Sequence, residues 1–453
     1  MAKYKSKIVF IATNWGAKYG GINSFNTDIC CALTGLIGNR YKIICIVLNA
    51  TKKDMESAKQ KGVILIPIYP NKVGEIDENW LDTALTKVKS IKPSSVYCWI
   101  GHDVKTGFAA IDASKKCDDD SFNVVIHHMD YQSYSAIHPE STFEKVKRQN
   151  RLLSNGDFVF AVGPLLEESA KDKVSDKRKV FGIVPGLPKI RSMSLPTRFS
   201  AITFGRLNLR ADRIKQGKLA VAGFARACRI NKALVSTNPS ITAVGLSQND
   251  KIKEEIAELR SIAQTYAGRA IQVHPWPYID DREELHEELR KKSVSMMLSI
   301  HEGFGLVGWE AIAAEVPLVV TRNSGLFSLV DRFYEGPGTG CLFDVDIRGS
   351  LGDEPFNESD VDTVADALLT IYTSPEKWKR NAHQIKMLIS KTFTWNNAAK
   401  HMARILGIYN EPTIISHRTK REISKLLGCS KSYVNLMAEE IEKFYTIAST
   451  IQT

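Results

Sequence analysis

The chain lacks most of the features that would assign a protein to a structural class at a glance. It has 8 cysteines in 453 residues and no Cys-x-x-Cys pair, so the sequence implies neither a zinc site nor a disulfide framework. No stretch approaches the ~20 apolar residues of a membrane-spanning helix. The first residues also lack the long apolar region and the cleavage site of a signal peptide. These absences favour a cytoplasmic protein that requires no metal.

Internal repeats and long low-complexity tracts are missing too, which argues against solenoid and disordered architectures. The length exceeds what one hydrophobic core supports and predicts two large domains with a smaller addition. Acidic residues are outnumbered, and the net charge is +11. This excess suits a polyanionic partner or an anionic small ligand, and charge alone leaves both open. The sequence does not indicate an oligomeric state.

Short apolar runs rich in β-branched residues alternate with helical patterns through residues 1–190. Such alternation predicts a doubly wound parallel sheet with helices on both faces. The predicted strands cover residues 8–12, 43–48, 63–68, 95–100, 123–127 and 158–162.

The same alternation returns in residues 198–393, after a connector rich in proline, serine and basic residues. Residues 394–411 form one amphipathic helical pattern, and residues 412–453 are helical in pattern throughout. The expected fold is therefore α/β, with two Rossmann-like domains facing across a cleft and a small helical C-terminal extension. Ligands of such sheets bind at the carboxyl ends of the strands. The predicted strands of the second domain cover residues 201–205, 241–245, 271–275, 295–299 and 317–321.

The segment HEGFGLVGWEAIAAEVPLVV, residues 301–320, carries the strongest functional signal. It predicts a loop after a strand and then a helix from about residue 307. The glycines at 303 and 305 let the backbone approach a ligand, and the start of the helix suits a phosphate. Glu302 and Glu310 lie eight positions apart and are good acceptors for sugar hydroxyls.

This segment resembles the E-x7-E segment of retaining GT-B glycosyltransferases, the group that includes glycogen and starch synthases. The resemblance implies that Glu302 binds hydroxyls of the donor sugar and that Glu310 binds the ribose of a nucleotide sugar. It also implies a retaining transfer by front-face displacement, with no cofactor or metal besides the donor. One departure is Glu315, where a small residue, usually glycine, is expected. The backbone implied to lie near the sugar and diphosphate belongs to Phe304, Gly305, Leu306 and Val307.

Three segments of the first domain resemble the same group. KYGGINSF, residues 18–25, resembles the loop that folds over the diphosphate. WIGHDVKTG, residues 99–107, and VVIHHMDYQ, residues 124–132, resemble segments that line the cleft, and His127 is implied to lie beside the donor sugar. A core or capping role is the competing interpretation of each histidine. The residues singled out are Lys18, Gly20, Gly21, His102, Asp103, His127, His128 and Asp130.

In the second domain, FGRLNLRADRIKQGK resembles the segment whose cations neutralise the leaving diphosphate. Arg206 and Lys215 are the implied cations, and Lys218 competes with Lys215 because the spacing is unusually long. Two cations and a helix start can stabilise that charge without a metal. Further along, Trp276 or Tyr278 is placed to stack on the nucleotide base, although core packing explains these aromatics equally well.

Residues 412–453 continue past the point where the resemblance ends and themselves resemble a helix-turn-helix unit. The inner face is expected to include Ile423 and Leu427 on the first helix and Val434 and Met437 on the second. Basic and polar side chains would face outward and contact double-stranded DNA. The alternative is a tail that mediates dimerisation. The residues expected to contact DNA are Arg421, Lys431, Ser432, Tyr433 and Asn435.

The sequence therefore predicts a hexosyltransferase that uses a UDP-, GDP- or ADP-hexose and a hydroxyl acceptor. The basic tail makes hydroxymethylated DNA bases one candidate acceptor, and an envelope polysaccharide or lipid is the alternative. A non-catalytic DNA-binding sensor of nucleotide sugars is a third interpretation, because fold alone does not identify activity.

Overall fold

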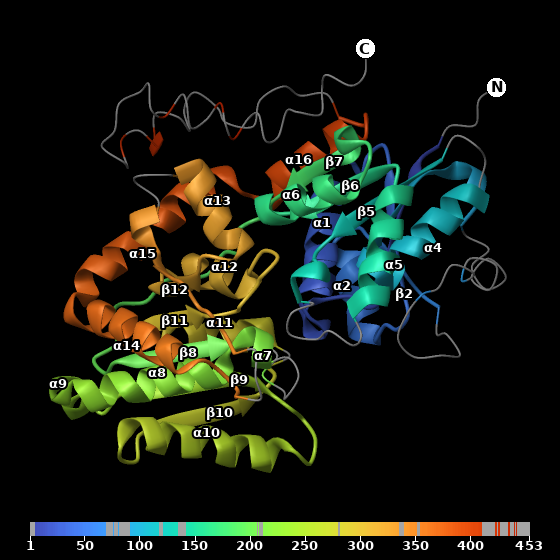
Figure 1. Ribbon diagram of the computed structural model, residues 1–453. Helices are drawn as coiled ribbons and strands as arrows, with labels where there is room; N and C mark the ends of the chain where they lie inside the picture. Colours follow the sequence, from blue (N-terminus) through green and yellow to red (C-terminus); the bar gives the residue numbers. More distant parts are fainter. Residues whose placement is uncertain are drawn as a thin grey trace.

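The computed structural model describes most of the chain as two parallel-sheet units joined by a connector (Figure 1). The expected α/β fold class is confirmed by this architecture. The described residues are 5–68, 76, 80, 91–116, 121–134, 142–205, 207, 212–279, 281–334, 339–350, 354–409, 422–423, 425, 434, 439 and 441.

The N-terminal sheet, within the described residues, is seven-stranded and parallel, with the order β3-β2-β1-β4-β5-β6-β7. Its central strands are apolar on both faces because helices cover both sides. The strands are β1 (Lys7–Ile11), β2 (Lys42–Val47), β3 (Ile64–Pro67), β4 (Val96–His102), β5 (Phe122–His127), β6 (Phe158–Val162) and β7 (Val180–Ile183). The helices are α1 (Gly21–Ile37), α2 (Lys52–Gln60), α4 (Asp103–Lys116), α5 (Thr142–Asn155) and α6 (Pro164–Lys173), with short turns η1 (Ala17–Tyr19), η2 (Pro93–Ser95), η3 (Gln132–Tyr134) and η5 (Lys177–Lys179).

The C-terminal sheet has the order β10-β9-β8-β11-β12-β13 in the described residues. This order reverses between β8 and β11, which is the point where open α/β sheets bind ligands. The strands are β8 (Ser200–Phe204), β9 (Ser240–Leu246), β10 (Gln272–Pro277), β11 (Val294–Met297), β12 (Leu318–Thr321) and β13 (Phe343–Val345). The helices are α7 (Asp212–Lys215), α8 (Gly217–Ile230), α9 (Lys232–Ser236), α10 (Ile252–Ala267), α11 (Arg282–Arg290), α12 (Leu306–Ala313), α13 (Gly325–Tyr334), α14 (Glu358–Thr373) and α15 (Pro375–Thr392), with the turn η6 (Thr339–Cys341).

The sequence analysis missed the last strand of each sheet, β7 and β13. Both are short, at four and three residues, and neither run is long enough to stand out from a loop. β7 is buried along its whole length, so its pairing with β6 is a consequence of tertiary packing.

The helix α16 (Trp395–Ile405) returns from the C-terminal unit to the N-terminal one, where Figure 1 shows it beside β7. Tyr97 of β4 donates its hydroxyl hydrogen to the carbonyl of Leu406 at 2.7 Å, and the Nε2 of His401 lies 2.9 Å from the carbonyl oxygen of Gly182. These contacts tie the two units together through the chain itself.

Beyond residue 409 the structure describes only six positions. Ile423, Val434 and Ile441 are buried, and Glu422 binds Lys391 of α15 at 2.6 Å. Burial of Ile423 and Val434 agrees with the expected inner face, but a dimerisation tail would bury the same side chains. The helix-turn-helix interpretation therefore stays a prediction. The expected DNA contacts Arg421, Lys431, Ser432, Tyr433 and Asn435 lie outside the described residues.

Candidate active site

Glu302 occupies the loop after β11, where the order of the C-terminal sheet reverses. Its carboxylate binds Lys215 of α7, the helix that follows β8, and accepts a hydrogen bond from Ser299 Oγ at 3.1 Å. The backbone reinforces this link, because the amide of Ile300 donates to the carbonyl of Ile214 at 2.9 Å. The ion pair therefore spans the switch point and places a cation and a carboxylate together where open α/β sheets bind ligands.

The loop between Glu302 and α12 is shaped for close approach to a ligand. Gly305 has a φ of 106°, a conformation that favours glycine, and it precedes the first helical residues Leu306 and Val307. The unpaired amides of this helix start and its positive dipole end suit an anion. The helix begins one residue earlier than expected, and Glu310 lies in its second turn.

The segment from Gly303 to Leu306 contacts the N-terminal domain at three points. A Cβ atom on Gly303 would lie 2.8 Å from the carbonyl oxygen of His128, and one on Gly21 would lie 2.9 Å from the Cδ1 of Leu306. Phe304 is buried and packs equally closely against Gly163. The structure thus brings together segments that are hundreds of residues apart in sequence.

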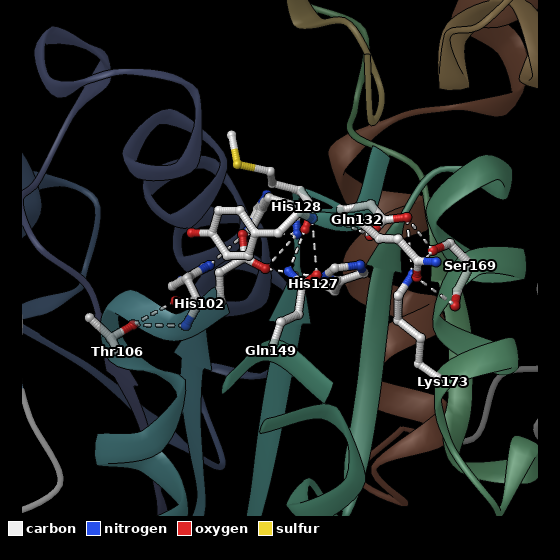
Figure 2. A network of polar contacts seen from close by, with 12 residues as sticks. His102, Thr106, His127, His128, Gln132, Gln149, Ser169 and Lys173 are labelled. Atoms are coloured by element: carbon white, nitrogen blue, oxygen red, sulfur yellow. Dashed lines mark hydrogen bonds and ion pairs between the residues drawn. The ribbon is translucent and has the colours of Figure 1, made fainter. Parts of the chain in front are cut away.

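His127 and Asp103 form a buried pair at the ends of β5 and β4, and Figure 2 shows His127 beside His128 and His102. The Nδ1–H of His127 donates to Asp103 at 3.0 Å, and the backbone amide of His128 donates to both carboxylate oxygens at 3.2 Å. In the tautomer that carries its hydrogen on Nδ1, Nε2 is an acceptor. That nitrogen is buried and has no hydrogen-bond partner among the described residues. In that tautomer it can accept a hydrogen bond from a ligand.

Asp103 adopts a strained backbone to make this pair. Its φ is 40°, in the left-handed region where aspartate is tolerated better than most residues. Such strain persists where the surrounding structure fixes it, and it is often found at functional sites.

His102 is held within a chain of neutral groups. Its Nε2–H donates to the amide oxygen of Asn26 at 2.9 Å, and its Nδ1 accepts from the Nε2–H of His128 at 2.9 Å. Burial lowers the pKa of His102 to about 3 and also depresses the pKa of His128. Both ring nitrogens of His102 are occupied, so this residue orients its neighbours and has none left for a ligand.

Asp130, which the sequence analysis placed in the cleft, holds the loop after β5. Its carboxylate pairs with Lys173 at 3.0 Å, accepts from Ser169 Oγ at 2.7 Å and from the amide of Gln132 at 3.1 Å. These bonds lower the pKa of Asp130 against the opposing effect of burial. The geometry gives it a supporting role for the turn that carries Tyr134, whose ring lies edge-on to His301 at 5.4 Å.

Glu310 faces a second cluster that includes a residue of the other domain. Arg282 Nε and His286 Nε2, both from α11, each lie 3.6 Å from Glu310 Oε1. Arg282 Nη1 also contacts Asp28 Oδ2 of α1 at 3.1 Å. Burial raises the pKa of Asp28, and the charge of Arg282 opposes that rise.

The remaining predicted residues occupy simpler positions. Lys18 lies in η1 and is exposed, and Gly20 precedes α1 with a φ of 97°. Trp276 is partly buried against the core and Tyr278 follows β10. Lys218, the competitor of Lys215, binds Glu258 of α10 instead. Arg206 lies outside the described residues.

Sequence reasoning missed Asn26, Asp28, Arg282 and His286. Arg282 and His286 stand in an ordinary charged helix, and Asp28 is 254 positions from its partner. No local pattern distinguishes such residues, because only the folded chain brings them together.

Metal-binding geometry is not evident in the described part of the chain, where no group of three or more His, Cys, Asp or Glu side chains is arranged to hold an ion. In the same residues, no helix combines the length and apolarity needed to cross a bilayer.

A family model described as "Family 4 Glycosyltransferase in conflict systems" matches residues 9–402. The chain belongs to this glycosyltransferase family. The expectation of a GT-B glycosyltransferase is confirmed at this level, whereas the closer grouping with glycogen synthases stays a prediction.

Solved structures share the fold at low sequence identity. Sucrose-phosphate synthase from Thermosynechococcus elongatus superposes with a TM-score of 0.65 and 16% identity over 88% of this chain and 98% of that one. The Anabaena protein HepE, solved with UDP and glucose, superposes with a TM-score of 0.62 and 14% identity over 89% of this chain and 99% of that one.

A GDP-mannose-dependent phosphatidylinositol dimannoside mannosyltransferase of Mycobacterium tuberculosis is 27% identical over 130 residues. The match covers 29% of this chain and 28% of the mannosyltransferase. It is therefore a similarity of one segment.

Proposed function

We propose that this protein transfers a hexose from a nucleotide sugar to a hydroxyl acceptor with retention of configuration. The observation that carries the proposal is the ion pair of Glu302 and Lys215 at the switch point of the C-terminal sheet, next to the close approach of Gly303 to His128 after β5. A sugar bound there would have a carboxylate for its hydroxyls, and its diphosphate would have a cation and a helix start. Family membership and the nucleotide-sugar enzymes among the structural neighbours support the same reaction.

We assign each residue of the site a role that follows from the chemistry of its side chain. Lys215 would stabilise the charge that develops on the leaving diphosphate, and Glu302 would orient the sugar hydroxyls. The bare Nε2 of His127 would accept a hydrogen bond from the sugar on its other side. The Asp103 carboxylate accepts hydrogen bonds from His127 and His128, so we assign it an orienting role, and the transfer that we propose is a front-face displacement.

The test is a turnover screen with UDP-, GDP- and ADP-hexoses, followed by mass spectrometry of donor and acceptor products. Glu302→Gln should lower turnover at least 100-fold, because a charge-assisted contact to the donor is lost. The matched control is Glu288→Gln on α11, whose carboxylate is similarly exposed but binds Lys291 and Lys292, which follow that helix. Equal turnover in the two variants would remove Glu302 from the site. Binding without any turnover would favour the sensor interpretation.

Hydroxymethylated DNA is the acceptor that we propose to test first. The net charge of +11 and the basic residues of the C-terminal tail support it, and the family description refers to conflict systems. Glycan and lipid acceptors form the second arm, since the mannosyltransferase named above acts on a phosphatidylinositol dimannoside. Removal of residues 412–453 should weaken duplex binding and its salt dependence. Unchanged binding would reject the tail as the DNA contact.

A further inference from the structure

Arg282 and His286 present two unsatisfied nitrogens to one carboxylate. Arg282 Nε and His286 Nε2 are buried atoms without a hydrogen-bond partner among the described residues. Each is 3.6 Å from Glu310 Oε1, which is beyond hydrogen-bonding distance. Buried polar atoms without partners are uncommon and costly, and two of them around one carboxylate indicate a missing ligand group.

The chemistry of the three groups defines what would satisfy them. Arg282 offers an N–H donor, His286 can offer another from Nε2, and the carboxylate only accepts. A hydroxyl group can donate to the carboxylate and accept from a neighbouring N–H at the same time. Two adjacent hydroxyls would therefore satisfy the hydrogen-bonding capacity of Arg282, His286 and Glu310 together. A ribose carries its 2′- and 3′-hydroxyls in that arrangement.

Asp28 fixes the position of Arg282 from the opposite domain. Its Oδ2 contacts Arg282 Nη1 at 3.1 Å, so the guanidinium has one edge on α1 and its Nε toward Glu310. The side chain of Arg282 is 28% exposed and that of Asp28 is 22% exposed, although Arg282 Nε itself is buried. Without Asp28, the Arg282 guanidinium could move closer and form a direct hydrogen bond with the Glu310 carboxylate. That bond would compete with a ribose for the same carboxylate.

We propose that Arg282 and His286 complete a binding site for the ribose 2′,3′-diol around Glu310, and that Asp28 is a positioning residue that keeps Arg282 available for it. This inference rests on the proposed nucleotide-sugar function and extends it to residues on α11 and α1. The site selects ribonucleotides, and its geometry depends on contact between the two domains.

Binding of nucleoside diphosphates, measured by isothermal titration calorimetry on the full chain, tests the inference. UDP, GDP and ADP are screened first, and the one that binds is compared with its 2′-deoxy and 3′-deoxy forms. The wild-type protein should bind each deoxy form about tenfold more weakly, in line with loss of a hydrogen bond to a charged group.

Arg282→Gln and His286→Gln should each weaken binding of the ribonucleotide about tenfold and leave the affinity for one deoxy form nearly unchanged. Asp28→Asn should weaken the ribonucleotide three- to fivefold, and it should add nothing in the Arg282→Gln background. The control is Arg332→Gln, which removes a different contact between the domains, to Glu167 at 3.8 Å, and should keep the wild-type discrimination.

The outcomes distinguish a failure of the ribose site from a failure of the proposed function. If the variants weaken ribo and deoxy forms equally, or if Asp28→Asn acts as strongly without Arg282, the ribose assignment is overturned while the donor site stands. If no nucleoside diphosphate binds the wild-type protein, the proposed function and this inference both fail. Should Arg282→Gln not fold, His286→Gln and Arg282→Lys decide the question with the same ligands.

Discussion

The two sides of the candidate site are built differently, although both lie at the ends of parallel strands. On the N-terminal side, a chain of hydrogen bonds connects Asp103 with His127 and His128, and His128 with His102. Burial lowers the pKa of His102 and His128, so these two rings are neutral near pH 7. On the C-terminal side, Glu302 and Glu310 are partly exposed and held by cations. Hydrogen bonds in a buried network fix geometry, whereas a partly exposed ion pair can exchange one partner for a polar group of a ligand. We therefore expect the N-terminal side to act as a fixed template and the C-terminal side to rearrange when a donor binds.

The largest effect expected from this contrast follows a change in the fixed side. Asp103→Asn keeps a residue that tolerates a positive φ, but it leaves one acceptor oxygen for the two donors of His127 and His128. Turnover should fall about 100-fold, because His127 loses its fixed tautomer and orientation. Steady-state kinetics and a thermal melt measure the two consequences separately.

The control for that change is Asp130→Asn, which also removes a buried carboxylate but lies in the loop after β5 with other partners. It should destabilise the fold through loss of the Lys173 pair, yet reduce turnover less than fivefold. If both variants lose turnover equally, Asp103 acts only through stability and the template interpretation is wrong.

An effect of intermediate size is expected on the free energy of unfolding as the pH falls. The pKa of His102 is lowered to about 3 and that of His128 is also lowered, so the unfolded chain binds more protons between about pH 3 and pH 6.5. Stability is fully present above pH 6.5 and falls as the pH drops, by about 1.4 kcal/mol per pH unit for each histidine. Urea unfolding at pH 7.5, 6 and 5 should show this slope, and His102→Gln should reduce it. An unchanged slope in the variant would place the titrating groups elsewhere.

The smallest effect concerns Glu315, the position where the family pattern expects a small residue. Glu315 has a φ of 57°, and its carboxylate contacts Lys386 at 3.0 Å and His383 at 3.2 Å. Those contacts lower its pKa against the effect of burial and compensate for the backbone strain. Glu315→Gly should be more stable than Glu315→Ala by about 1 kcal/mol, because only glycine removes the strain. Chemical denaturation of both variants checks the order.

Most strands could be predicted from the sequence because buried parallel strands are continuous apolar runs, as in β1 and β6. The Glu302 motif could be predicted because its spacing is local. β7 and β13 could not, since their short runs become strands only beside a neighbour. The orienting role of His102 could not be predicted either, because its partner Asn26 is 76 residues away and only the fold brings the two side chains together.

The sequence by itself determined the alternation of strands and helices, the two domains and the loop that carries Glu302. These depend on periodicity, glycine and spacing within a few residues. Only the tertiary structure decided which charged groups meet: Lys215 rather than Lys218 beside Glu302, and Asp28 with Arg282 beside Glu310. Such pairs act across space and across domains, so no local pattern encodes them.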